Sequence, residues 1–150
     1  MRKIYISLAV LCVMFVSCAP LSGVKQTGDA TEVLEEIVSV FSISDGALYS
    51  DKENAPYPLT DALLARMFPE EGALSGFRYV ESAAVYFSRR FSEREIIVLK
   101  VCDLSHQEAL LSLLRTRARK KENAVAFANG VYIYLVCTEN NEQIKSYLTS

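Results

Sequence analysis

The pattern of hydrophobic and polar positions changes sharply near residue 18. Residues 4–16 form an apolar run that only Ser7 interrupts, and Arg2 and Lys3 precede it. A membrane-spanning helix needs roughly 20 apolar residues, whereas the apolar region of a secretory signal needs roughly 7–15. We therefore expect residues 1–17 to be a signal peptide that is removed, and the folded domain to follow it.

Helical spacing of apolar residues opens the body of the chain. Asp29 and Glu32 have the spacing of a capping box, and Val33, Leu34 and Ile37 then fall on one helical face. Residues 18–30 are rich in small and polar residues and are expected to be a tether. Further along we expect a loop over 47–58, a short helix over 60–68 that ends at Pro69, and a turn over 70–76.

Alternating or continuous apolar runs predict four strands in two hairpins. The first strand, over 77–88, is expected to bulge near Glu81, and the second, over 94–102, is apolar on both faces and should lie at the centre of a sheet. The second hairpin consists of residues 124–128 and 131–137, joined by Asn129-Gly130.

Two more helices complete the prediction. Ser105 and Glu108 form a second potential capping box, which begins a helix that extends to about Lys121. A final helix is expected over 140–148. The predicted fold is α+β, in the order α-α-β-β-α-β-β-α. A small mixed or antiparallel sheet of about four strands packs with three to four helices in one domain over 31–150.

Cys18 is the strongest indication of where in the cell this protein is located. It ends the run Phe15-Val16-Ser17-Cys18, and the small residue before it suits a lipoprotein-processing enzyme. Cys12 does not suit that enzyme, since the bulky Leu11 precedes it. The sequence predicts a diacylglyceryl thioether on Cys18, which would hold the chain on the outer face of the cytoplasmic membrane. An ordinary cleaved signal and an uncleaved anchor are the alternatives.

Charge and cysteine content narrow the function classes. The whole chain carries a net charge of −2, and loss of Arg2 and Lys3 with the signal would leave 14 basic against 18 acidic residues, or −4. This mild acidity argues against nucleic-acid binding, which rests on phosphate neutralisation. The remaining Cys102 and Cys137 could form a disulfide or remain two core thiols. With one histidine and no CxxC pair, the sequence predicts no metal site and no cofactor.

Several of these features together resemble a known family. They are the processing site at Cys18, the early amphipathic helix, the strand Glu95–Val101, a helix with a late arginine cluster, and the surroundings of Gly130-Val131-Tyr132. Over roughly residues 30–150 the chain resembles a domain-of-unknown-function family of small predicted lipoproteins from Gram-positive, clostridial-type bacteria. The stretch between the arginine helix and the hairpin is shorter here. The resemblance implies a location and a fold, and it transfers no site residues.

One run of basic residues is the main candidate for a binding site. The run could bind an anion or an acidic partner, such as an envelope component. Alternatively, it is a solvated helix end whose charges complement the helix dipole. The run consists of Arg115, Arg117, Arg119, Lys120 and Lys121.

For each of the other candidate site residues, a purely structural role is the alternative. His106 starts a helix and has no nucleophile suitably placed beside it, so we expect a surface histidine. A cluster of arginines surrounds the first hairpin turn, and two tyrosines share one strand face, where they could stack a sugar or cover the sheet. These are Arg89, Arg90 and Arg94, and Tyr132 and Tyr134.

Taken together, these features predict a lipid-anchored extracytoplasmic protein without a catalytic constellation. We expect a non-catalytic binding or accessory domain that contacts another envelope protein or a cell-wall component. The alternatives are a small-solute binding or sensing lipoprotein and an envelope hydrolase with dispersed site residues. The sequence alone does not identify the ligand or the partner.

Overall fold

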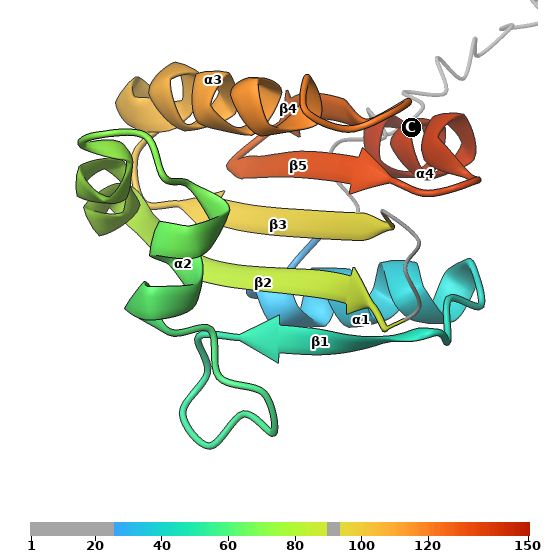
Figure 1. Ribbon diagram of the computed structural model, residues 1–150. Coiled ribbons are helices and arrows are strands. Elements are labelled where there is room, and N and C mark those ends of the chain that lie inside the picture. Colours follow the sequence, from blue (N-terminus) through green and yellow to red (C-terminus); the bar gives the residue numbers. More distant parts are fainter. Residues whose placement is uncertain (1–25, 90–93) are drawn as a thin grey trace, which may run out of the picture.

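A five-stranded antiparallel sheet between two layers of helices forms the protein (Figure 1). The computed structural model describes residues 26–89 and 94–150. The strand order is β1-β2-β3-β5-β4, so β1 and β4 are the two edges. The α+β prediction is confirmed, with one strand more than expected. The strands are β1 (Gly46–Ser50), β2 (Val80–Ser88), β3 (Glu95–Val101), β4 (Val125–Asn129) and β5 (Tyr132–Cys137).

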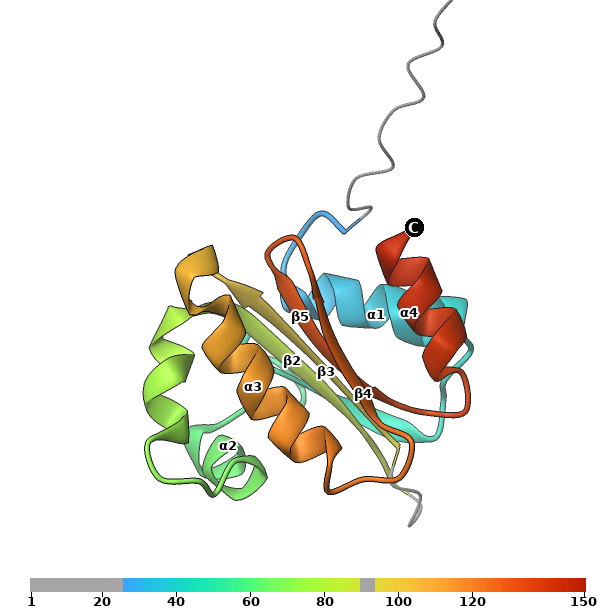
Figure 2. The ribbon, with the colours of Figure 1, turned by 90° about the horizontal axis from the view of Figure 1, so that it is seen from above.

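The helices are divided between the two faces of the sheet, as Figure 2 shows. One face carries α1 (Ala30–Val40) and α4 (Asn141–Thr149). The other face carries α2 (Asp61–Met67), the 3-10 helix η1 (Ala73–Tyr79) and α3 (Gln107–Ala118), which follows a short 3-10 turn, η2 (Leu104–His106). Each face therefore has its own apolar core.

Strand β3 is buried on both faces, as its continuous apolar run predicts. Ile96 and Val98 pack with the α1 and α4 layer, while Ile97 and Leu99 pack with the α3 layer. All four side chains are almost entirely inaccessible to solvent. Covering a strand on both sides explains why the sequence around it does not alternate.

Helix α1 begins where its predicted capping box lies. The Asp29 carboxylate accepts hydrogen bonds from the backbone N–H groups of Thr31 and Glu32, and the Glu32 carboxylate accepts one from Asp29 N–H. The Ser82 hydroxyl accepts from Ala30 N–H at 2.8 Å, which fastens the start of α1 to β2. The prediction for this helix is confirmed.

The loop predicted over 47–58 is wrong in its first part, because Gly46–Ser50 forms strand β1. All five residues pair with β2, from Gly46 opposite Ser88 to Ser50 opposite Ala84. This segment has little apolar periodicity of its own, and its partner lies more than thirty residues away in the sequence. Pairing with β2 therefore decides its conformation.

The segment predicted to be a turn and the start of a strand is instead the 3-10 helix η1. Strand β2 begins at Val80 rather than at residue 77, and its register shifts between Val80 and Ser82. The predicted bulge near Glu81 is thus confirmed, and it lies at the beginning of the strand.

The capping box predicted at Ser105 and Glu108 is wrong. Asp103 caps the preceding 3-10 turn, since its carboxylate accepts from Ser105 N–H at 2.8 Å, and α3 begins at Gln107. Ser105 lies inside this turn, so it is not the residue that caps α3; His106 occupies that position and makes no side-chain capping bond. The helix also ends at Ala118 rather than at Lys121.

The second hairpin forms with its turn one residue later than predicted. Asn129 pairs with Tyr132, so the two turn residues are Gly130 and Val131. Gly130 has a φ of 57°, while no positive φ occurs at Val131. A turn with a left-handed first residue takes glycine at that position, which explains the shift.

Cys102 and Cys137 lie too far apart to form a disulfide. Cys137 pairs with Glu95 at one end of β3, whereas Cys102 follows Val101 at the other end. Seven residues of strand span about 23 Å, against roughly 4–7 Å between the Cα atoms of a disulfide. Cys137 is buried, whereas Cys102 is exposed, so the alternative of two core thiols holds for Cys137 alone.

Candidate functional site

The predicted basic patch on α3 is divided by the fold into buried and exposed members. Arg117 and Lys121 turn inward, with side chains that are each 17% exposed, toward the completely buried carboxylate of Glu95. Arg117 Nε lies 2.7 Å from one carboxylate oxygen, and Lys121 Nζ lies 2.8 Å from the other. Both side chains therefore already have a carboxylate partner inside the protein.

Arg117 is held by further contacts besides the one with Glu95. Its guanidinium donates to the carbonyl oxygen of Met67 and lies over the ring of Phe68, 5.6 Å from the ring centre. One side chain thus joins α3 to β3 and to the end of α2. We call Glu95, Arg117 and Lys121 the buried ion triad. The two cations share this one carboxylate, and their contacts with it link α3 and the residues after it to β3.

The exposed members of the predicted patch have weaker partners. Arg115 pairs with Glu108 on the same helix, and Lys120 pairs with Glu70, both at 2.6 Å. The contact with Lys120 lowers the pKa of Glu70. Arg119 donates to the Thr116 hydroxyl at 3.2 Å, and no carboxylate of the described residues pairs with it. Arg115 and Arg119 therefore remain on the surface as cations one helical turn apart.

Arg89 and Arg94, two of the three arginines around the first hairpin, also have structural partners. Arg90 lies outside the described residues. Arg89 donates to the Tyr57 hydroxyl at 2.7 Å. Arg94 pairs with Asp45 at 3.2 Å and also with Glu139. The contacts of Arg94 link the start of β3 to the loop before β1 and to the loop after β5.

Asp45 is the centre of this second polar cluster. Its carboxylate accepts hydrogen bonds from the hydroxyls of Tyr86 and Ser88, each at 2.9 Å, and from Arg94. Burial raises the pKa of Asp45, but the hydroxyl hydrogen bonds and the charge of Arg94 outweigh burial and leave that pKa below its ordinary value. Burial and the neighbouring carboxylate raise the pKa of Tyr86 to about 12.

The two tyrosines of β5 do not form a stacking platform for a ligand. Both lie under α1 and α4 and are almost completely buried. The Tyr132 hydroxyl donates to the carbonyl oxygen of Gly28 at 2.8 Å. The Tyr134 hydroxyl has no hydrogen-bond partner among the described residues, and burial raises its pKa. These side chains therefore cover the sheet rather than stack on a sugar, the other role considered for them.

His106 lies at the start of α3 and is half-buried rather than fully exposed. Its ring stacks on Tyr79, with ring centres 3.3 Å apart and planes at 9°. The Arg78 guanidinium also lies over the Tyr79 ring, 4.7 Å from the ring centre. The contact fixes the end of η1 to the start of α3, which is a packing role.

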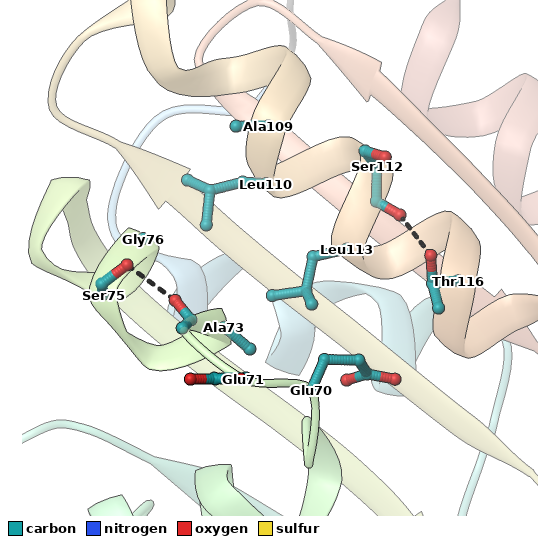
Figure 3. A pocket seen from close by; sticks show the side chains of 11 residues that line it. Glu70, Glu71, Ala73, Ser75, Gly76, Ala109, Leu110, Ser112, Leu113 and Thr116 are labelled. Carbon is teal, nitrogen blue, oxygen red and sulfur yellow. Dashed lines mark hydrogen bonds between the residues drawn. The ribbon is translucent and has the colours of Figure 1, made fainter.

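An open groove runs between η1 and α3 (Figure 3). It has a volume of about 380 Å³, and Leu110 and Leu113 point from α3 toward η1. Its polar groups serve the chain itself, since Thr116 donates to the Ser112 carbonyl oxygen. Glu70 and Glu71, which border it, come from one loop, so they cannot face each other across a substrate as paired catalytic carboxylates must.

A second groove lies on the other flank of α3, beside the edge strand β4. It has a volume of about 510 Å³ and combines small apolar residues at its base with cations at its rim. We call it the β4 groove. Its lining residues are Arg115, Ala118, Arg119, Lys121, Ala124 and Ala126. Of this groove, the sequence predicted only the basic residues Arg115 and Arg119. It did not predict the open edge of β4 next to them.

Three further features concern chemistry and location. No group of three or more His, Cys, Asp or Glu side chains in the described part of the chain is arranged to hold a metal ion. Within residues 26–89 and 94–150, no helix is long and apolar enough to cross a membrane. The predicted lipid-bearing Cys18 lies outside the described residues.

The chain was also compared with known proteins. No protein-family model, curated protein or solved structure matches it. The functional conclusions below therefore depend on the sequence and on the geometry of the molecule itself.

Proposed function

We propose that this protein is a lipid-anchored extracytoplasmic lipoprotein whose folded domain is a non-catalytic binding or accessory module for another envelope protein. The signal-like residues 1–17 and Cys18 support the anchor. The resemblance to small predicted lipoproteins of Gram-positive bacteria agrees with this location. The domain would face the outside of the cytoplasmic membrane.

The uncovered outer edge of β4, with the β4 groove beside it, is the observation that carries the binding role. An edge strand presents unpaired backbone N–H and C=O groups, which can pair with another chain. Several ionised groups that a catalytic or small-solute site could use are instead paired within the fold, in the buried ion triad and around Asp45. A surface contact is therefore favoured over a site that encloses a small molecule.

The tether length agrees with action close to the membrane. The described domain starts at Gln26, so seven residues separate it from Cys18. A flexible chain of this length spans roughly 15 Å on average. The domain would thus reach partners that lie at or just above the bilayer surface.

The anchor is tested by the mass of the protein recovered from membranes. In a bacterial host that processes lipoproteins, the full chain should yield a membrane-bound form that begins at residue 18 and carries a diacylglyceryl group. Cys18→Ala should abolish both cleavage at this site and lipidation, whereas the matched variant Cys12→Ala should change neither. Recovery of an unmodified chain in the cytosol that still carries Met1 would contradict the proposal.

A further inference from the structure

The register of the second hairpin decides which backbone groups of β4 point away from the sheet. Asn129 lies opposite Tyr132, and Phe127 lies opposite Tyr134. In a hairpin with a two-residue turn, the pair next to the turn is hydrogen-bonded and every second pair after it is too. The N–H and C=O groups of Ala126 and Ala128 therefore point outward.

The two edges of the sheet differ in how they are covered. On β1, the last residue of the strand is covered: Ser50 N–H donates to the carbonyl oxygen of Tyr57 at 3.0 Å, and Leu59 N–H donates to the Ser50 carbonyl oxygen at 2.8 Å. No backbone group among residues 26–89 and 94–150 pairs in this way with β4. Strand β4 also has no charged residue and no proline, which are common means of blocking an edge.

The surface beside this edge is basic, although the whole chain is acidic. Arg115 and Arg119 are exposed on the flank of α3 that borders the β4 groove. Arg115 already pairs with Glu108, so Arg119 is the one of the two that pairs with no carboxylate among the described residues. The outward-pointing residues of β4 are alanines whose side chains lie on this same face. A strand added next to β4 would therefore carry every second side chain toward the two guanidinium groups.

We propose that the edge of β4 pairs with an extended, acidic segment of a partner protein. The segment would add a sixth strand, with Asp or Glu side chains on the face toward Arg115 and Arg119. This inference rests on the proposed function and names the chemistry of its partner. The face toward α4 imposes no such charge, since both Lys145 and Glu142 border it.

Two other segments that could pair with the edge of β4 fit the charges of Arg115 and Arg119 less well. Residues 1–25 of this chain contain no Asp or Glu, so the leader and tether supply no carboxylate for the α3 flank. In a second copy paired β4 to β4 about a twofold axis, both α3 helices would lie on one face of the joined sheet. The arginines of the two copies would then face each other, which like charges disfavour.

The probe for this inference is a fluorescent peptide of about eight residues in which Glu and Val alternate. The protein is the full lipidated chain in detergent. We expect the peptide to bind, to bind more weakly as salt rises, and to slow hydrogen–deuterium exchange over residues 124–129. A peptide with Lys in place of Glu, and one with its alternate backbone nitrogens methylated, should each bind at least about tenfold more weakly.

Variants then separate charge from backbone pairing. Arg119→Glu should weaken binding of the Glu peptide roughly two- to fivefold, whereas the matched reversal Arg66→Glu, on an exposed residue of α2, should not. Ala126→Pro removes an outward N–H and should abolish binding. If that variant does not fold, the methylated peptide answers the same question with the unchanged protein.

The inference is overturned if the Glu peptide binds no better than the Lys peptide, or if protection appears elsewhere than over 124–129. Dimerisation of the protein through this strand, seen by light scattering and abolished by Ala126→Pro, would likewise overturn it in favour of a second copy. Neither result affects lipidation at Cys18. Loss of lipidation with intact peptide binding would instead contradict the proposed location alone.

Discussion

At the scale of single residues, Glu95 shows how a charged side chain can belong to the core. It is completely buried, and Arg117 and Lys121 each contact one of its carboxylate oxygens. Arg117 and Lys121 lie four residues apart, a spacing that suggests a shared face of the predicted helix, although α3 itself ends at Ala118. Their carboxylate partner is not visible in the sequence, because Glu95 lies on a strand more than twenty residues earlier, and only the packing of α3 on β3 brings them together.

Glu95→Gln should destabilise the protein strongly. The change leaves two largely buried cations without a counter-charge, and breaking a buried pair in this way costs about 3–5 kcal/mol. Glu108→Gln, which removes the exposed partner of Arg115, should cost less than about 1 kcal/mol. Urea denaturation of both variants measures the difference, and equal losses would show that the buried ion triad has no special role.

Asp45 should make part of the stability depend on acid pH. Its pKa is lower in the folded protein than its ordinary value of 3.8. The contribution to stability is therefore full above the unfolded pKa and disappears as the pH falls through the lower, folded pKa. Asp45→Asn should be less stable than the native chain at pH 7, and the gap should narrow between about pH 5 and pH 2.

Denaturation midpoints of the two proteins across this pH range test the claim about Asp45. Asp61→Asn is a suitable control, since Asp61 is exposed at the start of α2. A gap for Asp45→Asn that stays constant down to pH 2 would contradict the role of the ionised carboxylate.

At the scale of elements, the sequence predicts best those segments whose own residues carry the signal. The central strand β3, the capping box of α1 and the short helix after Thr60 all have local patterns, and all form near the predicted positions. Strand β1 has no such pattern and was missed, because its conformation comes from pairing with β2. The open edge of β4 could not be predicted either, since it depends on the order of strands in the sheet.

The turn of the second hairpin should be sensitive to glycine replacement. Gly130 has a left-handed φ of 57°, which costs a residue with a Cβ about 1–2 kcal/mol. Gly130→Ala should therefore destabilise the protein by about that amount. Gly76→Ala is the matched control, because its new Cβ would lie 3.5 Å from Leu110, an ordinary contact, and it should be neutral or slightly stabilising.

Thermal or chemical denaturation compares the two glycine variants directly. A neutral Gly130→Ala would indicate that the turn relaxes to another geometry and that the register of β4 is less fixed than described. The outward direction of Ala126 and Ala128, which is deduced from that register, would then no longer hold.

At the scale of the whole molecule, the count of reactive thiols reports on processing and folding together. The chain has four cysteines. A mature protein that has lost Cys12 and carries lipid on Cys18 retains Cys102 and Cys137, which the fold keeps at opposite ends of β3. We expect two thiols after denaturation and four in an unprocessed chain.

In the native protein only one of those two thiols should react quickly. Cys102 is exposed, whereas Cys137 is buried beside Glu95 in the sheet. Titration with a thiol reagent before and after denaturation distinguishes the two. No reactive thiol in the denatured mature protein would mean that Cys102 and Cys137 are oxidised or otherwise modified, contrary to the register.

The hydrogen bond between Tyr132 and Gly28 bears on how the domain would be oriented relative to the membrane. It holds the first described residues beside the turn of the second hairpin. If residue 18 is anchored in a bilayer, the end of the sheet with that turn would lie nearer the bilayer. Asp45, Arg94 and Glu139, at the opposite end of the sheet, would lie farther from it. A strand that joined β4 would then stand upright rather than lie flat, with one end at the lipid headgroups and the other directed toward the wall.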